Sequence, residues 1–178
     1  MILVLGTGRS GTSTIARLLH ENLKINMGSR FRSDETNPQG FYEDLEIKNL
    51  NIELLEDGRW GKEKIHNLLA LKKEPFGIKD PRVCNLWQVY KQIINKDTKI
   101  IVTIRDANQV IRSMIRWYNW SEVYCRNLIA ARLFGINQLL IGKSALLIDF
   151  SIKRKDEELT QLLSNFLRKN NEDKSSSN

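Results

Sequence analysis

The stretch Met1-Ile2-Leu3-Val4-Leu5-Gly6-Thr7-Gly8-Arg9-Ser10-Gly11-Thr12-Ser13 predicts a buried strand, a glycine-rich turn and the beginning of a helix. The apolar residues suit a strand that is covered on both faces, and an amphipathic run follows from Thr14. Successive backbone N–H groups at a helix N-terminus attract anions, because they point outward and the helix dipole is positive at that end. The opening of the chain therefore predicts a binding site for a phosphate-type group.

The segment Gly6-Thr7-Gly8-Arg9-Ser10-Gly11-Thr12-Ser13 fits two nucleotide-binding patterns. Its three glycines match the dinucleotide pattern G-x-G-x-x-G. The same segment fits the Walker frame G-x-x-x-x-G-K-[ST], except that Thr12 occupies the lysine position. The missing lysine would hold the β- and γ-phosphates of a triphosphate, so an ordinary ATPase or GTPase is disfavoured. The positive charge of this loop comes instead from Arg9.

Apolar and amphipathic segments alternate along the chain. Apolar runs predict buried parallel strands at 2–5, 76–78, 100–104 and 146–148, and a short run near 24–27 is a further strand candidate. Helical periodicity is found at 14–22, 44–56, 83–95, 107–118, 122–140 and 157–169. Asp106, followed by Gln109, gives the helix at 107–118 a start that resembles a capping box. This alternation predicts an α/β fold, with a doubly wound, mainly parallel sheet flanked by helices, similar to the P-loop NTPases.

Length and charge limit the organisation and the partners of the chain. At 178 residues we expect a single domain over 1–169, followed by a polar, disordered tail over 170–178. The net charge of +7 suits an anionic ligand. The basic residues are spread along the chain without a basic, aromatic-interleaved arm, so we do not expect a nucleic acid as partner.

The cysteines and the chain start bear on cellular location. Cys84 and Cys125 have neither the spacing of a metal site nor that of a disulfide framework. No apolar run is long enough to span a bilayer, and Met1 leads directly into the first predicted strand. We therefore expect a cytoplasmic protein with no transmembrane segment and no metal.

Basic residues follow three of the predicted strands. Arg9 lies in the first loop, Lys79-Asp80-Pro81-Arg82 follows the second strand, and Arg105 follows the third. Because the carboxyl ends of parallel strands meet at one edge of a sheet, these cations should lie close together. Several cations at one edge predict a site for a ligand that carries more than one phosphate group.

These residues lie in segments that resemble the sulfotransferases that use 3′-phosphoadenosine 5′-phosphosulfate (PAPS). Gly8-Arg9-Ser10-Gly11-Thr12-Ser13 resembles the loop of that family that binds the 5′-phosphosulfate. The segment Ile101-Val102-Thr103-Ile104-Arg105-Asp106-Ala107-Asn108-Gln109-Val110-Ile111-Arg112-Ser113 resembles its 3′-phosphate motif, in which an arginine ends a strand and a serine follows eight positions later. Phe76-Gly77-Ile78-Lys79-Asp80-Pro81-Arg82 and Asn37-Pro38-Gln39-Gly40-Phe41-Tyr42-Glu43 are similar to elements of bacterial-type members.

The resemblance implies an enzyme that transfers a sulfuryl group from PAPS to an acceptor hydroxyl and releases adenosine 3′,5′-bisphosphate. The acceptor would be a carbohydrate or another small molecule. The resemblance also implies that Arg105 and Ser113 bind the 3′-phosphate. It implies that the 5′-phosphosulfate is bound by Gly8, Arg9, Ser10, Gly11, Thr12 and Ser13.

Catalysis of this transfer needs cations and a base. Arg9 and Lys79 are expected to stabilise charge on the sulfuryl oxygens and on the leaving phosphate. The acceptor hydroxyl needs a proton acceptor, for which Glu43 is the first candidate and Asp80 the second. A structural role is an equally good interpretation of Glu43, as an acidic residue in the first turn of a helix. For Asp80, a turn or capping role is about as good an interpretation as the role of catalytic base.

Two further features concern the acceptor. Trp60, Trp117 and Trp120 are candidates for stacking on a sugar, although tryptophans near helices more commonly pack in a core. The segment 28–44 is long, polar and without clear periodicity, which is typical of a binding loop or lid. Both histidines are expected to be solvent-facing or structural.

Two other function classes stay open. An NADP-type oxidoreductase would explain the glycines and would place Ser29-Arg30 near a 2′-phosphate, but it gives no role to Arg105 with Ser113. A P-loop kinase is favoured by Asp149 at the end of an apolar strand and opposed by Thr12 in the loop.

Overall fold

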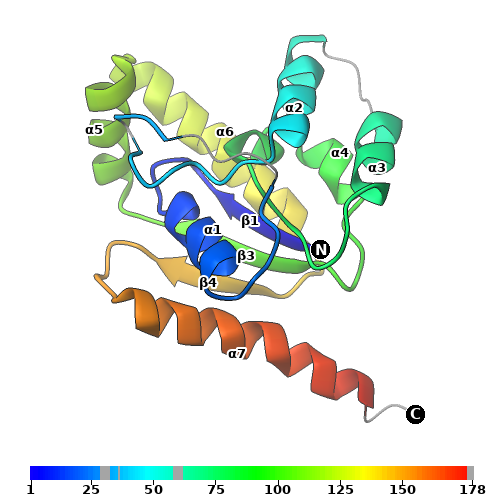
Figure 1. Cartoon of the computed structure of the whole chain (residues 1–178). Helices are drawn as coiled ribbons and strands as arrows, with labels where there is room; N and C mark the ends of the chain where they lie inside the picture. Colours follow the sequence, from blue (N-terminus) through cyan, green and yellow to red (C-terminus); the bar gives the residue numbers. More distant parts are fainter. Residues whose placement is uncertain (29–32, 36, 58–61, 176–178) are drawn as a thin grey trace.

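The computed structural model describes residues 1–28, 33–35, 37–57 and 62–175, and their centre is an all-parallel sheet. Within these residues the sheet has four strands in the order β2-β1-β3-β4. They are β1 (Ile2–Gly6), β2 (Gly77–Lys79), β3 (Lys99–Ile104) and β4 (Ala145–Asp149), as Figure 1 shows. The four main apolar runs are therefore strands, and the prediction of a parallel α/β sheet is confirmed. The run at 146–148 is not fully buried as expected, because Leu147 on the outer strand β4 is exposed.

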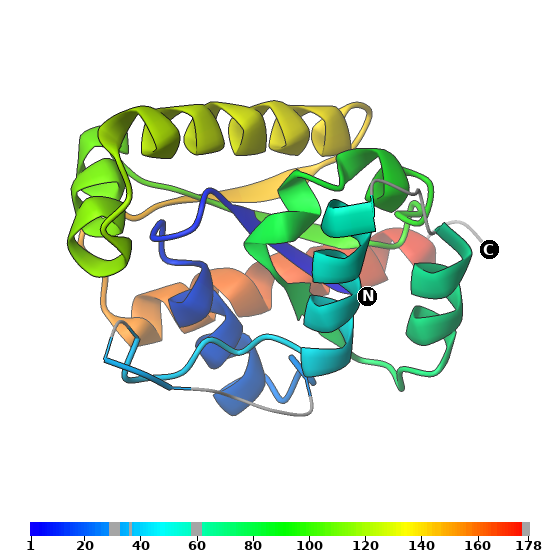
Figure 2. The same cartoon turned by 90° about the horizontal axis from the view of Figure 1, so that it is seen from above.

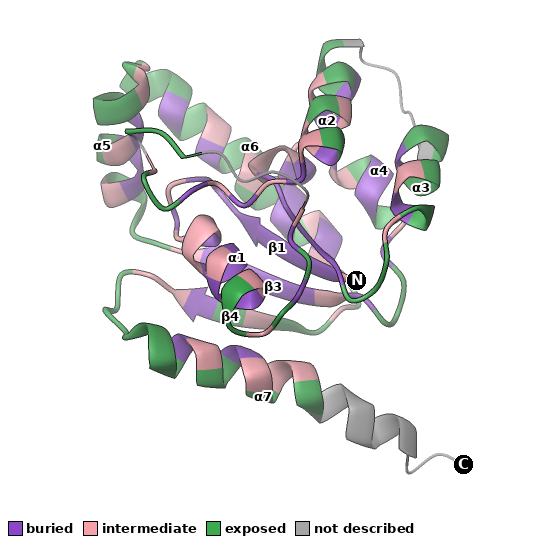
Figure 3. Cartoon of the chain, viewed as in Figure 1, coloured by how far each residue is buried: buried purple, intermediate pink, exposed green. Residues whose placement is uncertain are grey.

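The residues of β1 alternate between two apolar layers, one on each face of the sheet. Leu3 and Leu5 pack into a core with the helices α2, α3, α4 and α6, whereas Ile2 and Val4 pack against α1 and α7. A strand that is buried on both faces needs a continuous apolar run, which is what the sequence provides. Figure 3 shows the buried strand β1 between the more exposed helices.

Helices cover both faces of the sheet, as Figures 1 and 2 show. Helix α1 (Thr12–Glu21) and helix α7 (Asp156–Ser175) pack together on one face. Helix α6 (Glu122–Leu140) lies on the other face with α4 (Trp87–Lys91) and contacts α5 (Ala107–Tyr118). Helix α2 (Leu45–Asp57) and α3 (Lys62–Ala70) add to the same side as α4. This arrangement is compatible with a doubly wound fold.

The expected helix at 83–95 is wrong, because the chain forms two short elements there. A 3₁₀ helix, η1 (Pro81–Cys84), comes first and α4 follows. Asp80 begins η1, since its carboxylate accepts the backbone N–H of Arg82, and Pro81 takes the first helical position. Leu86 has non-helical angles (φ −96°, ψ 25°), and this break separates the two elements.

Other differences are smaller. Helix α3 was not expected, because its apolar face consists only of Ile65, Leu68 and Leu69 in a polar sequence. The candidate strand near 24–27 is reduced to a single bridge between Asn26 and Phe76. Helix α7 ends at Ser175 rather than near 169. None of the helices in the described part of the chain is long and apolar enough to cross a membrane.

Candidate functional site

The register of the sheet brings the ends of the strands to one edge. Val4 of β1 lies beside Lys79 of β2, and Gly6 lies beside Thr103 of β3. The segments that follow β1, β2 and β3 therefore begin next to one another, as expected for parallel strands. All three basic segments that the sequence pointed to lie at this edge.

The loop after β1 turns sharply into α1. Gly8 and Gly11 have φ values of +81° and +93°, and Arg9 between them has +55°. Gly11 caps α1, and a side chain there would lie 2.4 Å from the ring of Phe150. The loop therefore needs glycine at position 11 both for its backbone angle and for the close approach of Phe150. Its backbone leads directly to the positive end of the α1 dipole.

Ser10 anchors the loop from below. Its side chain is fully buried, and its hydroxyl shares a hydrogen bond of 3.1 Å with the hydroxyl of Thr103 on β3. A Cβ atom at Gly6 would lie 2.5 Å from both hydroxyl oxygens, so this contact requires glycine at position 6. The Ser10 hydroxyl is thus held by the sheet, and the whole residue is buried beneath the loop.

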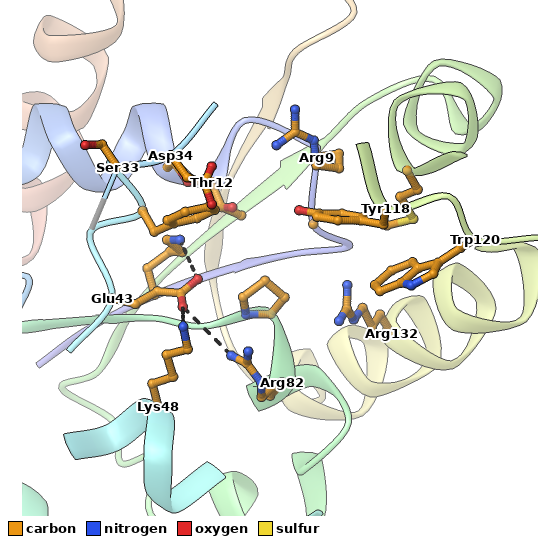
Figure 4. Close-up of a pocket in the computed structure, with 16 residues that line it drawn as sticks. Arg9, Thr12, Ser33, Asp34, Glu43, Lys48, Arg82, Tyr118, Trp120 and Arg132 are labelled. Atoms are coloured by element: carbon orange, nitrogen blue, oxygen red, sulfur yellow. Dashed lines mark hydrogen bonds and ion pairs between the residues drawn. The ribbon is translucent and has the colours of Figure 1, made fainter. Parts of the chain in front are cut away.

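A cavity of about 590 Å³, the central cavity, opens above this loop (Figure 4). It is bordered by the loop, by residues within 33–34 and 41–48, by η1 and by the facing sides of α5 and α6. Its charged lining residues are mostly cations, namely Arg9, Lys48, Lys79, Arg82 and Arg132, with the carboxylates of Asp34 and Glu43. Such a lining suits an anionic ligand.

Glu43 is held by cations on one side of the central cavity. Its carboxylate accepts a hydrogen bond of 2.9 Å from Lys79 Nζ, and Lys48 and Arg82 lie at 3.8 Å. Only 2% of the Lys79 side chain is exposed, and this burial lowers the pKa of Lys79 while the charge of Glu43 opposes the effect. The ammonium group also lies 5.8 Å from the centre of the Phe41 ring. The sequence expectation that Glu43 and Lys79 share one site agrees with this contact.

Asp80, the second candidate for the base, lies outside the described lining of the central cavity, unlike Glu43. The Asp80 carboxylate accepts hydrogen bonds from Arg82 Nη1 at 2.7 Å and from Asn51 Nδ2 at 3.0 Å, and Asn51 Oδ1 in turn accepts from the Tyr90 hydroxyl at 2.9 Å. All of Asn51, Asp80 and Tyr90 are buried, and burial raises the pKa of Tyr90. This chain of hydrogen bonds fixes Arg82 at the cavity. The location of Asp80 therefore suits the positioning of Arg82 better than the acceptance of a proton from the acceptor.

Arg105 and Ser113 meet at the glycine loop. Arg9 Nε donates to Ser113 Oγ at 3.0 Å, and Arg105 Nη1 donates to the backbone oxygen of Arg9 at 3.3 Å. A second cavity of about 170 Å³, the loop-side cavity, is bordered by Arg9, Gly11, Thr12, Ser13, Thr14, Asn37 and Arg105. The residues assigned to the 5′- and 3′-phosphates, far apart in the sequence, are therefore neighbours.

Arg132 is a site residue that the sequence expectations missed. It projects from α6 into the central cavity and donates to the backbone oxygen of Thr7 at 2.5 Å and to Asn85 Oδ1 at 3.3 Å. Burial lowers the pKa of Arg132. A signal was present, because position 132 continues the buried stripe of α6 at Cys125, Ile129, Ile136 and Leu139. A charged residue on a buried stripe indicates a special environment.

Of the three tryptophans proposed for sugar stacking, the two that the structure describes differ in their location. Trp120 lines the central cavity together with Tyr118, and their ring centres lie 4.6 Å apart. Trp117 is exposed and is not among the described lining residues. Trp60 lies outside the described residues, as does the Ser29-Arg30 pair of the NADP interpretation.

The described histidines and Asp149 do not join the site. Neither His20 nor His66 is among the described residues that line the central cavity, and His66 is exposed on α3. Asp149 lies on β4, which β3 separates from β1, and its carboxylate accepts the backbone N–H of Ser151 at 2.7 Å. Its place at an outer strand weakens the argument for a kinase.

In comparisons with known proteins, no family model matches the chain, and a search of curated proteins finds no match. The case for a function therefore rests on the residues and geometry of the site.

Proposed function

We propose that the chain is a PAPS-dependent sulfotransferase of the P-loop-like α/β type. The observation that carries this proposal is the junction at Arg9, where the glycine loop, Arg105 and Ser113 are joined by hydrogen bonds. One end of a nucleotide would lie on the loop and α1, and a second phosphate would lie within reach of Arg105 and Ser113. A single-phosphate nucleotide would leave Arg105 without a role.

In this proposal each cation has a task during transfer. The acceptor oxygen forms a bond to sulfur, the bond from sulfur to the 5′-phosphate oxygen breaks, and adenosine 3′,5′-bisphosphate leaves. Arg9 and the N–H groups of the loop stabilise the charge that develops on the leaving phosphate, and Lys79 stabilises the sulfuryl oxygens. Glu43 takes the proton of the acceptor hydroxyl, since its carboxylate lines the central cavity and is bound to Lys79.

The site favours this reaction over the two alternatives. The lysine position of the Walker frame is Thr12, and Asp149 is bound within its own turn on an outer strand. The NADP-type interpretation does not explain the hydrogen bond between Arg9 and Ser113. The acceptor is a carbohydrate or another small molecule that enters the central cavity, and no nucleic acid is needed.

Thermal unfolding with three nucleotides tests the class of ligand. A ligand that binds only the folded state raises its stability in proportion to its affinity and concentration. At equal concentrations, adenosine 3′,5′-bisphosphate should raise the melting temperature more than ATP or NADPH does. A larger shift with ATP and magnesium would support the kinase, and a larger shift with NADPH would support the oxidoreductase.

Turnover of PAPS labelled in the sulfuryl group tests catalysis. Arg9→Ala should reduce turnover about 100-fold, as expected for the loss of one donor to a developing negative charge. The matched control is Arg126→Ala, because Arg126 is exposed on α6 and pairs only with Glu122 among the described residues. Equal turnover in the Arg9→Ala and Arg126→Ala proteins would contradict the assignment of Arg9.

A further inference from the structure

Arg132 differs in its partners from Lys48, Lys79 and Arg82, the cations of the central cavity that form ion pairs with carboxylates. Lys79 is paired with Glu43 at 2.9 Å and Arg82 with Asp80 at 2.7 Å. In the part of the chain that the structure describes, no ion pair includes Arg132, and its hydrogen bonds go to the neutral oxygens of Thr7 and Asn85. A partly buried cation without a counter-ion is costly, and a bound anion reduces that cost.

Arg132 shares the lining of the central cavity with two aromatic residues. Tyr118, the last residue of α5, and Trp120, which follows the helix, form one side of the central cavity, which we call the aromatic wall. Their ring centres lie 4.6 Å apart at an interplanar angle of 35°. Figure 4 shows the guanidinium group of Arg132 beside these rings, on the opposite side of the cavity from Glu43. Flat aromatic surfaces bind planar rings through offset or edge-to-face stacking.

The cavity thus has two ends with different chemistry. Glu43 and its paired cations occupy one end, and Arg132 with the aromatic wall occupies the other. A neutral sugar offers no counter-ion to Arg132. A planar ring that carries a negative charge would satisfy both Arg132 and the aromatic wall.

We infer that the acceptor is an aromatic anion, a planar ring that carries a carboxylate or similar group at Arg132 and presents its hydroxyl toward Glu43. This inference rests on the proposed function, because it assigns the acceptor end of the same cavity. The aromatic wall sets the preference for a ring, and Arg132 sets the preference for a charge.

Three small probes separate these two preferences. 4-Hydroxybenzoate has both the ring and the charge, 4-hydroxybenzyl alcohol has the ring alone, and trans-4-hydroxycyclohexanecarboxylate has the charge without a planar ring. Calorimetric titrations use the full chain, with and without saturating adenosine 3′,5′-bisphosphate. We expect 4-hydroxybenzoate to bind at least tenfold more tightly than either of the other two, a factor typical of one charge-assisted hydrogen bond.

Substitutions test whether Arg132 causes the preference for a charge and whether Trp120 causes the preference for a planar ring. Arg132→Met should abolish the preference for 4-hydroxybenzoate over the neutral alcohol, and Trp120→Leu should abolish its preference over the cyclohexane acid. The controls are Arg126→Met and Trp117→Leu, which change a cation and a tryptophan outside the cavity lining and should keep both preferences. The ratio of two ligands within one variant is insensitive to a general loss of stability.

The outcomes are distinct from those of the proposed function. If the wild-type protein binds all three probes equally, or if the ratios in the Arg132→Met and Trp120→Leu proteins match wild type, the inference is wrong. Tighter binding of the cyclohexane acid than of 4-hydroxybenzoate overturns the aromatic class. Failure of adenosine 3′,5′-bisphosphate to bind would count against the proposed function, and the probe titrations without nucleotide would still report on the acceptor end.

Discussion

Replacing Arg105 with methionine should weaken the binding of adenosine 3′,5′-bisphosphate and leave the binding of AMP unchanged. Arg105 is exposed and donates to the side chain of Gln109 at 3.0 Å and to the backbone oxygen of Arg9 at 3.3 Å. Exposed contacts of this kind contribute little to folding, so the variant should be folded. A charge-assisted hydrogen bond to the 3′-phosphate contributes about 1.5–3 kcal/mol. That energy corresponds to a loss of about 10- to 150-fold in affinity.

The assay is a calorimetric titration of both nucleotides into wild type, Arg105→Met and Arg112→Met. Arg112 is an exposed arginine on α5, next to Ser113 in sequence, and it serves as the control for a change of net charge. We expect only Arg105→Met to lose affinity, and only for the bisphosphate. If Arg105→Met loses affinity equally for both nucleotides, Arg105 acts on the loop through Arg9 rather than on the 3′-phosphate. Unchanged affinity for both would refute the reasoning entirely.

Three further predictions concern the base, the alkaline stability and the loop. Glu43→Gln should keep nucleotide binding and lose about 100- to 10,000-fold in single-turnover transfer, and wild-type transfer would exclude Glu43 as the base. Burial, followed by the hydrogen bond to Glu21, raises the pKa of Tyr42 from 10.0 to about 12. The stabilising contribution of Tyr42 is therefore present below about pH 10 and is lost as the pH rises to about 12. In urea unfolding, the free energy of unfolding of Tyr42→Phe should decline less than that of wild type between these pH values. An identical decline in both proteins would contradict this origin. Gly11→Ala should lower the free energy of unfolding more than Gly142→Ala, because both have positive φ but only position 11 abuts another side chain, and equal losses would show that the contact is unimportant.

The sequence was sufficient for the elements that a single local pattern determines. The run Ile2–Gly6 and the other strands are continuous apolar stretches, and the helices α5 and α6 begin at capping residues, Asp106 and Ser121, that accept backbone N–H groups. Parallel strands place their carboxyl ends at one edge of the sheet whatever their order. For these reasons the edge that carries the basic segments was predictable.

The sequence was insufficient where tertiary contacts decide. The break at Leu86 depends on the turn that Asp80 and Pro81 impose on the chain before it. The role of Asp80 was ambiguous, since its partner Asn51 comes from α2, far away in the sequence. Arg132 continues the buried stripe of α6, but it enters the site only because α6 packs across η1, and this contact joins segments far apart in the sequence.

The part of the site that could be predicted consists of residues next to strand ends. Lys79 ends β2, Arg105 directly follows β3 and Arg9 lies in the short loop after β1, so the topology brings them together. Lys48 and Tyr118 reach the cavity from helices, and their orientation depends on how each helix packs. The cofactor end was therefore more accessible to sequence reasoning than the acceptor end.

The central claim is that the site recognises a 3′-phosphate next to a phosphate on the glycine loop. The most direct measurement compares the affinities of adenosine 3′,5′-bisphosphate and adenosine 2′,5′-bisphosphate by calorimetry on the wild-type chain. These isomers have the same charge and the same base, so a difference between them reports only on the position of the second phosphate. We predict at least tenfold tighter binding of the 3′,5′ isomer, on the order of one charge-assisted hydrogen bond. Equal affinities, or tighter binding of the 2′,5′ isomer, would contradict the assignment of Arg105 and Ser113 and with it the proposed sulfotransferase.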